Sequence, residues 1–199
     1  MTLGAQTTRD LRNTVLIVAL LNLAYFGVEF AGALWSGSVA LFADSVDFLE
    51  DAAVNLLIFA AIGWTAARRA NVGIALAAIM LIPAAAFLWT LWSKFAAPVP
   101  PAAFAMSAIG LGALAVNLTC AFLLARHRAE HGSLTKAAFL SARNDALANV
   151  AVIAAALITL AYPSIWPDII VGLGIAWLNL DAAGEVWRAA REEKKLANA

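Results

Sequence analysis

Long apolar runs and short polar breaks alternate along the chain. The runs cover residues 14–35, 40–66, 72–95, 102–125, 137–161 and 165–187. A helix needs about 20 apolar residues to cross the hydrocarbon core of a bilayer, so each run is long enough to span it once. The pattern therefore predicts an all-α, polytopic membrane protein with six transmembrane helices.

The breaks between the runs contain the residue types of turns and loops. Ser36-Gly37-Ser38 separates the first two runs, and a proline-rich stretch at 97–101 separates the third and fourth. Pro and Gly interrupt helices because of their backbone requirements. We expect three parts, namely an N-terminal tail at 1–13, a transmembrane domain at 14–187 and a C-terminal tail at 188–199.

The composition is that of an integral membrane protein. Hydrophobic residues make up 63% of the 199 positions and charged residues only 13%, whereas soluble domains carry about 25% charged residues. Six spans with short loops use nearly all of this length, so we expect no separate soluble domain. The single cysteine, Cys120, lies in an apolar run, cannot form an internal disulfide and is expected to be a small core residue.

The basic residues are distributed unequally between the two sides of the predicted membrane. All 13 Lys and Arg residues except Lys94 lie in the tails or around the links that follow the second and fourth runs. Basic residues accumulate on the cytoplasmic side, so we expect both termini in the cytoplasm. The predicted location is the cytoplasmic (inner) membrane of a bacterium. Because topology explains these charges, we expect no nucleic-acid partner.

Four polar residues share one face of the second predicted helix. Asp44, Asp47, Asp51 and Asn55 lie within an arc of about 80° on a helix with 3.6 residues per turn. Asp47 and Asp51 are one turn apart, so both can touch one ion. A charged side chain at the bilayer centre costs about 2.5–3.5 kcal/mol on insertion scales, which makes it a candidate functional residue.

A second polar stripe lies in the fifth predicted helix. Ser141, Asp145 and Asn149 follow one another at four-residue spacing. Asp145 falls at about the same depth in the membrane as the acidic residues of the second helix. If the two helices pack together, their oxygen atoms form one cluster suited to a cation, which indicates a metal-ion transporter.

A less specific interpretation is that some of these polar side chains only join helices by hydrogen bonds. Ser and Asn commonly do so in membranes, and this alternative stays open for Ser141, Asn55 and Asn22. It is weaker for the three aspartates, because ionised carboxylates that lie together repel one another unless a cation or a proton is bound.

Two segments resemble the cation diffusion facilitator family. Asn22, Glu29, the Ser36-Gly37-Ser38 corner, Ala43-Asp44-Ser45 and Asp47-x-x-x-Asp51 keep the spacing of that family's first two helices without gaps. Asp145 is similar to the final Asp of the family's second metal-binding helix, with Asn149 one turn later. Trp166-Pro167-Asp168 resembles the start of the family's last helix. The resemblance covers about residues 14–195.

The resemblance implies a function and a set of ligands. Asp47, Asp51 and Asp145 would bind the transported divalent cation, and Ser141 and Asn149 would lie beside them. The family exports zinc, manganese, iron, cobalt or cadmium in exchange for protons, usually as a homodimer. No resident cofactor is implied, since the metal is the cargo and protons are the counter-ion.

Three features depart from the family pattern. Ser141 stands where the family commonly has His, and 66–71 replaces a loop that usually contains His and Gly. The chain ends soon after the sixth run, so we expect a short form without the cytoplasmic metal-binding domain. Ligands that are all oxygen favour a hard ion such as manganese, while family frequency favours zinc, which we rank first. Asn149 or a water would complete the shell.

Several other polar residues are candidates for supporting roles. Asp44, Glu29, Asn22 and Asn55 are candidates for supporting the ligands or carrying protons, although Glu29 has interhelical packing as an equal alternative. His127 and His131, four residues apart in a cytoplasmic link, are candidates for capturing metal, or are simply solvated. We assign no role to Glu50 or Asp181.

Two other classes of protein remain as alternatives. One is a membrane metal sensor or assembly subunit that binds an ion without moving it. The other is an intramembrane enzyme of the aspartyl type, which also places aspartates on two membrane helices. The chain contains no His-Glu-x-x-His, no Gly-x-Ser-x-Gly and no Gly-rich phosphate loop, so we do not expect an enzyme.

Overall fold

The computed structural model describes residues 2–61, 85–126 and 132–178, with side chains described for 9–60, 85–126 and 142–178. In these residues the chain is helical apart from short turns, and it contains no strand. The predicted all-α membrane fold is confirmed, because each predicted span has a helical stretch. The helices are α1 (Thr2–Ser36), α2 (Val39–Ala61), a stretch at 85–96, α4 (Ala103–Ala125), α5 (Gly132–Ala161) and a last one at Trp166–Leu178.

Two helices begin earlier than the apolar runs suggested. α1 starts at Thr2 rather than near residue 14, and α5 starts at Gly132 rather than near residue 137. Hydropathy reports which residues suit lipid, whereas helical hydrogen bonds form equally well beyond the lipid. The segment expected as an N-terminal tail is therefore a helical extension of α1 from Thr2 onward.

Among the described helices, three are long and apolar enough to cross a membrane by length and composition. These are Arg9–Ser36 in α1, Ala103–Ala125 in α4 and Ala142–Ala161 in α5. α2 has 23 residues, as α4 does. It differs because it carries four acidic side chains, three of which lie on the polar face predicted from the sequence.

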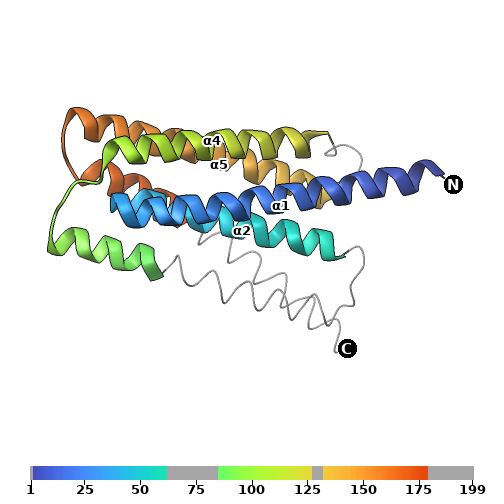
Figure 1. The fold of residues 1–199 in the computed structure, drawn as a ribbon, viewed down its shortest axis with the longest axis horizontal. Helices are drawn as coiled ribbons and strands as arrows, with labels where there is room; N and C mark the ends of the chain where they lie inside the picture. Colours follow the sequence, from blue (N-terminus) through green and yellow to red (C-terminus); the bar gives the residue numbers. More distant parts are fainter. Residues whose placement is uncertain (1, 62–84, 127–131, 179–199) are drawn as a thin grey trace.

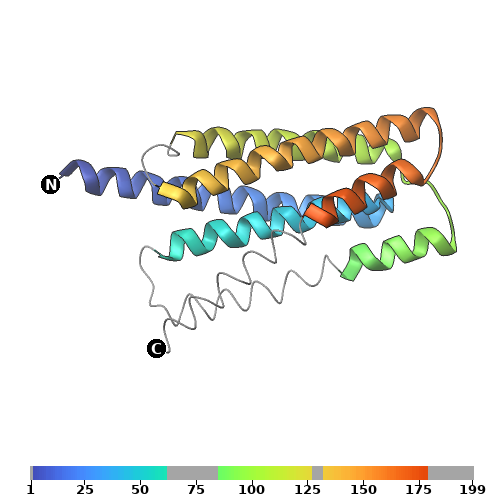
Figure 2. The same cartoon turned by 180° about the vertical axis from the view of Figure 1, so that it is seen from behind.

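Four long helices form the body of the molecule. α1 packs against α2 and α4, and α5 packs against α2 and α4, so each helix has two neighbours in the ring (Figure 1). The view from behind shows that the helices run along one common axis (Figure 2). The turn at 36–38 and the links at 97–102 and 162–165 all lie at one end, opposite the N-terminus. The second and fifth helices are thus neighbours, as a shared site requires.

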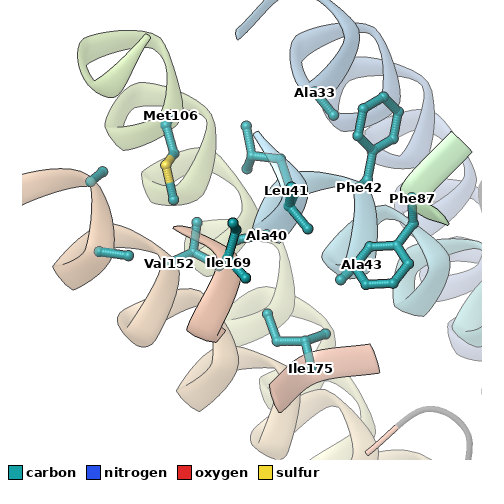
Figure 3. Packing of buried hydrophobic residues seen from close by; sticks show 13 residues of the cluster. Ala33, Ala40, Leu41, Phe42, Ala43, Phe87, Met106, Val152, Ile169 and Ile175 are labelled. Atoms are coloured by element: carbon teal, nitrogen blue, oxygen red, sulfur yellow. The ribbon is translucent and has the colours of Figure 1, made fainter. Parts of the chain in front are cut away.

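The first turns of α2 lie in the middle of a buried apolar cluster. Residues Val39 to Ala43 are almost completely buried and share this cluster with side chains from α4, α5 and the last helix (Figure 3). Phe42 lies beside Ala33 of α1 in this view and packs edge-on against Phe30 of α1. The outward surface is instead strongly apolar, with Phe104 82% and Trp35 77% exposed. Such a surface suits lipid rather than water. The protein is an integral membrane protein.

A close helix contact holds the last helix against α2. A Cβ atom added to Gly172 would lie 2.9 Å from Cγ1 of Val39 and 3.0 Å from the backbone N of Ala40. Backbone atoms cannot move aside cheaply, so a larger residue has no room.

Replacing Gly172 by alanine should lower the free energy of unfolding by about 1–3 kcal/mol, the usual cost of overpacking. Gly174 in the same helix is the matched control, because a Cβ added there meets nothing within 4 Å. Gly174→Ala should be neutral or gain up to about 1 kcal/mol from helix propensity. Thermal unfolding in detergent measures both, and equal melting temperatures would contradict the contact.

Candidate metal centre

The turn between α1 and α2 sets where the acidic face of α2 begins. Gly37 has a φ of 65°, a backbone conformation that glycine adopts at little cost. Its N–H donates to the carbonyl of Ala33 at 2.9 Å and so ends α1. Ser38 Oγ then accepts the N–H of Leu41 at 3.1 Å, which caps the start of α2.

A carboxylate from the last helix completes this cap. Asp168 Oδ1 accepts the Ser38 hydroxyl at 2.6 Å and the Ala40 N–H at 3.0 Å, and Oδ2 accepts the Val39 N–H at 2.8 Å. Asp168 is fully buried. A negative charge at a helix N-terminus is stabilised by the unpaired N–H groups and the helix dipole. Asp168 thus fixes the position of α2 in the bundle from a residue far away in the sequence.

The acidic face of α2 lies against α5 where the sequence predicted a shared site, at Asp51 and Asp145. The Asp145 carboxyl group lies within hydrogen-bonding reach of the Asp51 carboxyl group, and it is close enough to Asp47 for the two charges to interact. Asp51 is only 8% exposed, whereas Asp47 and Asp145 are partly exposed. The structure therefore brings one carboxyl pair into contact, with a third carboxyl group at longer range.

The three aspartates do not close around one point. Among the described residues, no three His, Cys, Asp or Glu side chains are arranged to hold one metal ion. Asp51 and Asp145 lie within hydrogen-bonding reach of each other, and Asp47 interacts with both through its charge. The metal-ligand role of the three aspartates stays a prediction. The side chain of Ser141 lies outside the described part of the chain.

α2 and α5 each carry an asparagine one helical turn after the aspartate of the carboxyl pair. Asn55 Nδ2 donates to the carbonyl of Asp51, and Asn149 Nδ2 donates to the carbonyl of Asp145, both at 2.8 Å. The Oδ1 atoms of both asparagines are buried and accept no hydrogen bond from the described residues. Amide oxygens are hard donors that coordinate cations such as manganese or calcium, so both are candidate further ligands.

Cys120 of α4 lies near the carboxyl pair. Its thiol is fully buried and free, and the charges of Asp51 and Asp145 act on it. The expectation of a small core residue is confirmed by its packing against Val18 and Ala142. Its closeness to the aspartates was missed, because no motif links α4 to them and only the packing of α4 on α5 brings them together.

The remaining predicted residues fall into two groups. Glu29 and Asp44 are fully buried and lie within hydrogen-bonding reach of each other between α1 and α2, and Asn22 is buried on the same face of α1. Glu50 is partly exposed on another side of α2. His127, His131 and Asp181 lie outside the described residues.

Comparison with known proteins adds a family and a relative. Residues 15–193 match the model of the cation efflux transmembrane domain. The chain is 32% identical to the zinc transporter ZitB of Pectobacterium atrosepticum over 193 residues. This alignment covers 89% of the chain and 58% of the relative, so the chain spans little more than half the length of that protein.

Proposed function

Because this chain belongs to the cation efflux family, we propose that it exports a divalent transition-metal ion from the cytoplasm in exchange for protons. The family is the one whose first two helices the sequence resembled, so the resemblance is confirmed. It is a family of transporters, which supports transport over the alternatives of an intramembrane enzyme and a non-transporting metal sensor.

The contact between Asp51 and Asp145 is the observation that carries the proposal. Asp51 lies about 18 Å along α2 from Val39 at 1.5 Å per residue, which is about halfway through a hydrocarbon core about 30 Å thick. Two carboxyl groups from different helices at this depth form a site that a cation can neutralise. A purely structural pair of acids would be costly at the same place.

Zinc is the ion that we rank first, with manganese, iron, cobalt and cadmium as alternatives. The relative is named as a zinc transporter, and zinc also accepts carboxylate ligands such as those of Asp51 and Asp145. Manganese remains the main competitor, because carboxylate and amide oxygens suit a harder ion.

The proposed cycle is alternating access at one site. Deprotonated Asp47, Asp51 and Asp145 take an ion from the cytoplasm, with Asn149 and Ser141 beside them. After the helices rock, protons from the other side displace the ion and return on the same carboxylates. Protons and metal ions compete for the same lone pairs, so the exchange needs no further carrier.

Orientation, membrane and assembly belong to the same proposal. The basic residues support cytoplasmic termini and a bacterial inner membrane. The links at 36–38, 97–102 and 162–165 would then lie on the side of the membrane opposite the cytoplasm. A homodimer is proposed from the family resemblance alone.

Metal-driven proton flux tests the function. The purified chain is reconstituted into vesicles that contain a pH-sensitive dye and is given Zn²⁺, Mn²⁺, Fe²⁺, Co²⁺ or Cd²⁺ in turn. Zinc should produce the largest proton counter-flow, and an imposed proton gradient should drive zinc against its own gradient. Zinc binding without any flux would favour the sensor, and cleavage of membrane substrates without flux would favour the enzyme.

A further inference from the structure

Glu29 of α1 and Asp44 of α2 form a buried carboxyl pair that the proposed metal ligands do not include. Both side chains are 0% exposed, and their carboxyl groups lie within hydrogen-bonding reach of each other. Within the described residues, no N–H or O–H group donates to any of the four carboxyl oxygens. Buried polar groups without such partners are rare in native proteins and call for an explanation.

The neighbouring groups do not neutralise this pair. Tyr25 of α1 is close enough to interact electrostatically with both carboxyl groups, but its hydroxyl donates to the carbonyl of Ile109 on α4 at 2.6 Å. Asp47 of α2 and Asp145 of α5 also interact electrostatically with the pair, and both are acidic as well. None of the charged groups that act on the pair from the described helices is basic.

A second buried polar side chain lies on the same face of α1. Asn22 lies two turns, about 10 Å, before Glu29. It is 0% exposed, and neither of its amide atoms has a hydrogen-bond partner in the described residues. The alternative that Asn22 only joins helices by a hydrogen bond finds no such bond among the described residues.

Two negative charges cannot both persist in this place. A buried carboxylate without a partner binds a proton rather than remaining charged, and two carboxylates that share a site retain one proton between them. Only a protonated carboxyl group can donate to the other. We propose that Glu29 and Asp44 form a proton-binding site that holds one proton between them, separate from the residues that bind the metal.

The position of the site couples it to the metal. Asp44 lies about 8 Å along α2 from Val39 and Asp51 about 18 Å, so the pair is about 10 Å from the metal centre on the side of the 36–38 turn. A divalent cation at Asp51 and Asp145 disfavours a proton on the pair through its positive charge. One O–H bond then breaks and the proton passes to water, and it returns when the ion leaves. This coupling rests on the proposed function, whereas the shared proton does not.

Infrared spectroscopy of the full chain in detergent, without metal, tests the shared proton. The wild type should show the C=O stretch of a protonated carboxyl group, with a shift in D2O. Glu29→Gln and Asp44→Asn should each remove one carboxyl contribution from this band. Both variants are expected to fold, because the new amide donates the hydrogen bond that the proton supplied. Asp10→Asn, at an exposed position, is the control and should leave the band unchanged.

A band of wild-type intensity in both variants would overturn the proposal. The coupling is tested by the protons released when Zn²⁺ is added to metal-free protein at neutral pH. Each variant should release fewer protons than the wild type, by up to about one per ion, and equal release in all three proteins would refute the coupling. Failure of the proposed function is distinguishable, because zinc would then not move in the wild type while the infrared difference persisted.

Discussion

Replacing Asp51 or Asp145 by alanine should abolish metal-driven proton flux. The two carboxyl groups contact each other between α2 and α5, so either substitution removes half of the contact that would hold the ion. Loss of residues that merely support metal ligands typically costs about 10–100-fold in metal affinity or activity, and loss of a ligand itself should cost about 100-fold or more. Flux in vesicles and zinc binding to the purified variants measure the effect.

The control for these variants is Asp10→Ala, which removes an exposed aspartate near the start of α1. It should transport at the wild-type rate. Asp51→Ala and Asp145→Ala should remain folded, because each removes one of two repelling acids from the membrane interior. Wild-type flux in either variant, with the protein folded, would refute the assignment of the metal centre.

Replacing Asp168 by alanine should destabilise the fold more than any other single substitution considered above. The change leaves three donors at the start of α2 without an acceptor. It also removes the negative charge that acts on the buried Lys94. Breaking a buried charged contact by deleting one partner costs about 3–5 kcal/mol, so the melting temperature in detergent should fall by many degrees.

Asp168→Asn separates the charge from the hydrogen bonds. Asparagine keeps Oδ1, which accepts from Ser38 and Ala40, but presents an NH2 group to the N–H of Val39. One unsatisfied buried donor costs about 1–3 kcal/mol. The melting temperature of Asp168→Asn should therefore lie between those of the wild type and Asp168→Ala. A melting temperature of Asp168→Ala equal to that of Asp10→Ala would show that the cap contributes nothing.

Much of the fold could be predicted from hydropathy, because a lipid bilayer constrains the length and composition of every helix that crosses it. Each crossing needs a long apolar helix, and six such runs predicted the six helical stretches. The ends of α1 and α5 were less accessible, since helical hydrogen bonds continue beyond the lipid into polar residues such as those before Asn13. Hydropathy carries no information about that continuation.

The candidate site could be predicted in part, because the helical period determines which residues share a face. The 3.6-residue period places Asp44, Asp47 and Asp51 on one face of α2, and the spacing of Asp145 and Asn149 does the same for α5. That period cannot say which helices are neighbours. The contact of Asp51 with Asp145 and the nearby Cys120 of α4 appear only when α5 packs against both α2 and α4.

Local pattern thus specified the elements, their polar faces and the family, all of which depend on residues close together in the chain. Tertiary packing decided the rest, because it joins residues that are far apart in sequence. It set Asp168 on the start of α2 across a separation of 128–130 residues. It also brought Glu29 against Asp44 at a place where no N–H or O–H group of the described residues donates to either carboxyl group. The burial of a charge and the identity of its partner are properties of the assembled bundle, since only packed helices exclude water and lipid from a side chain.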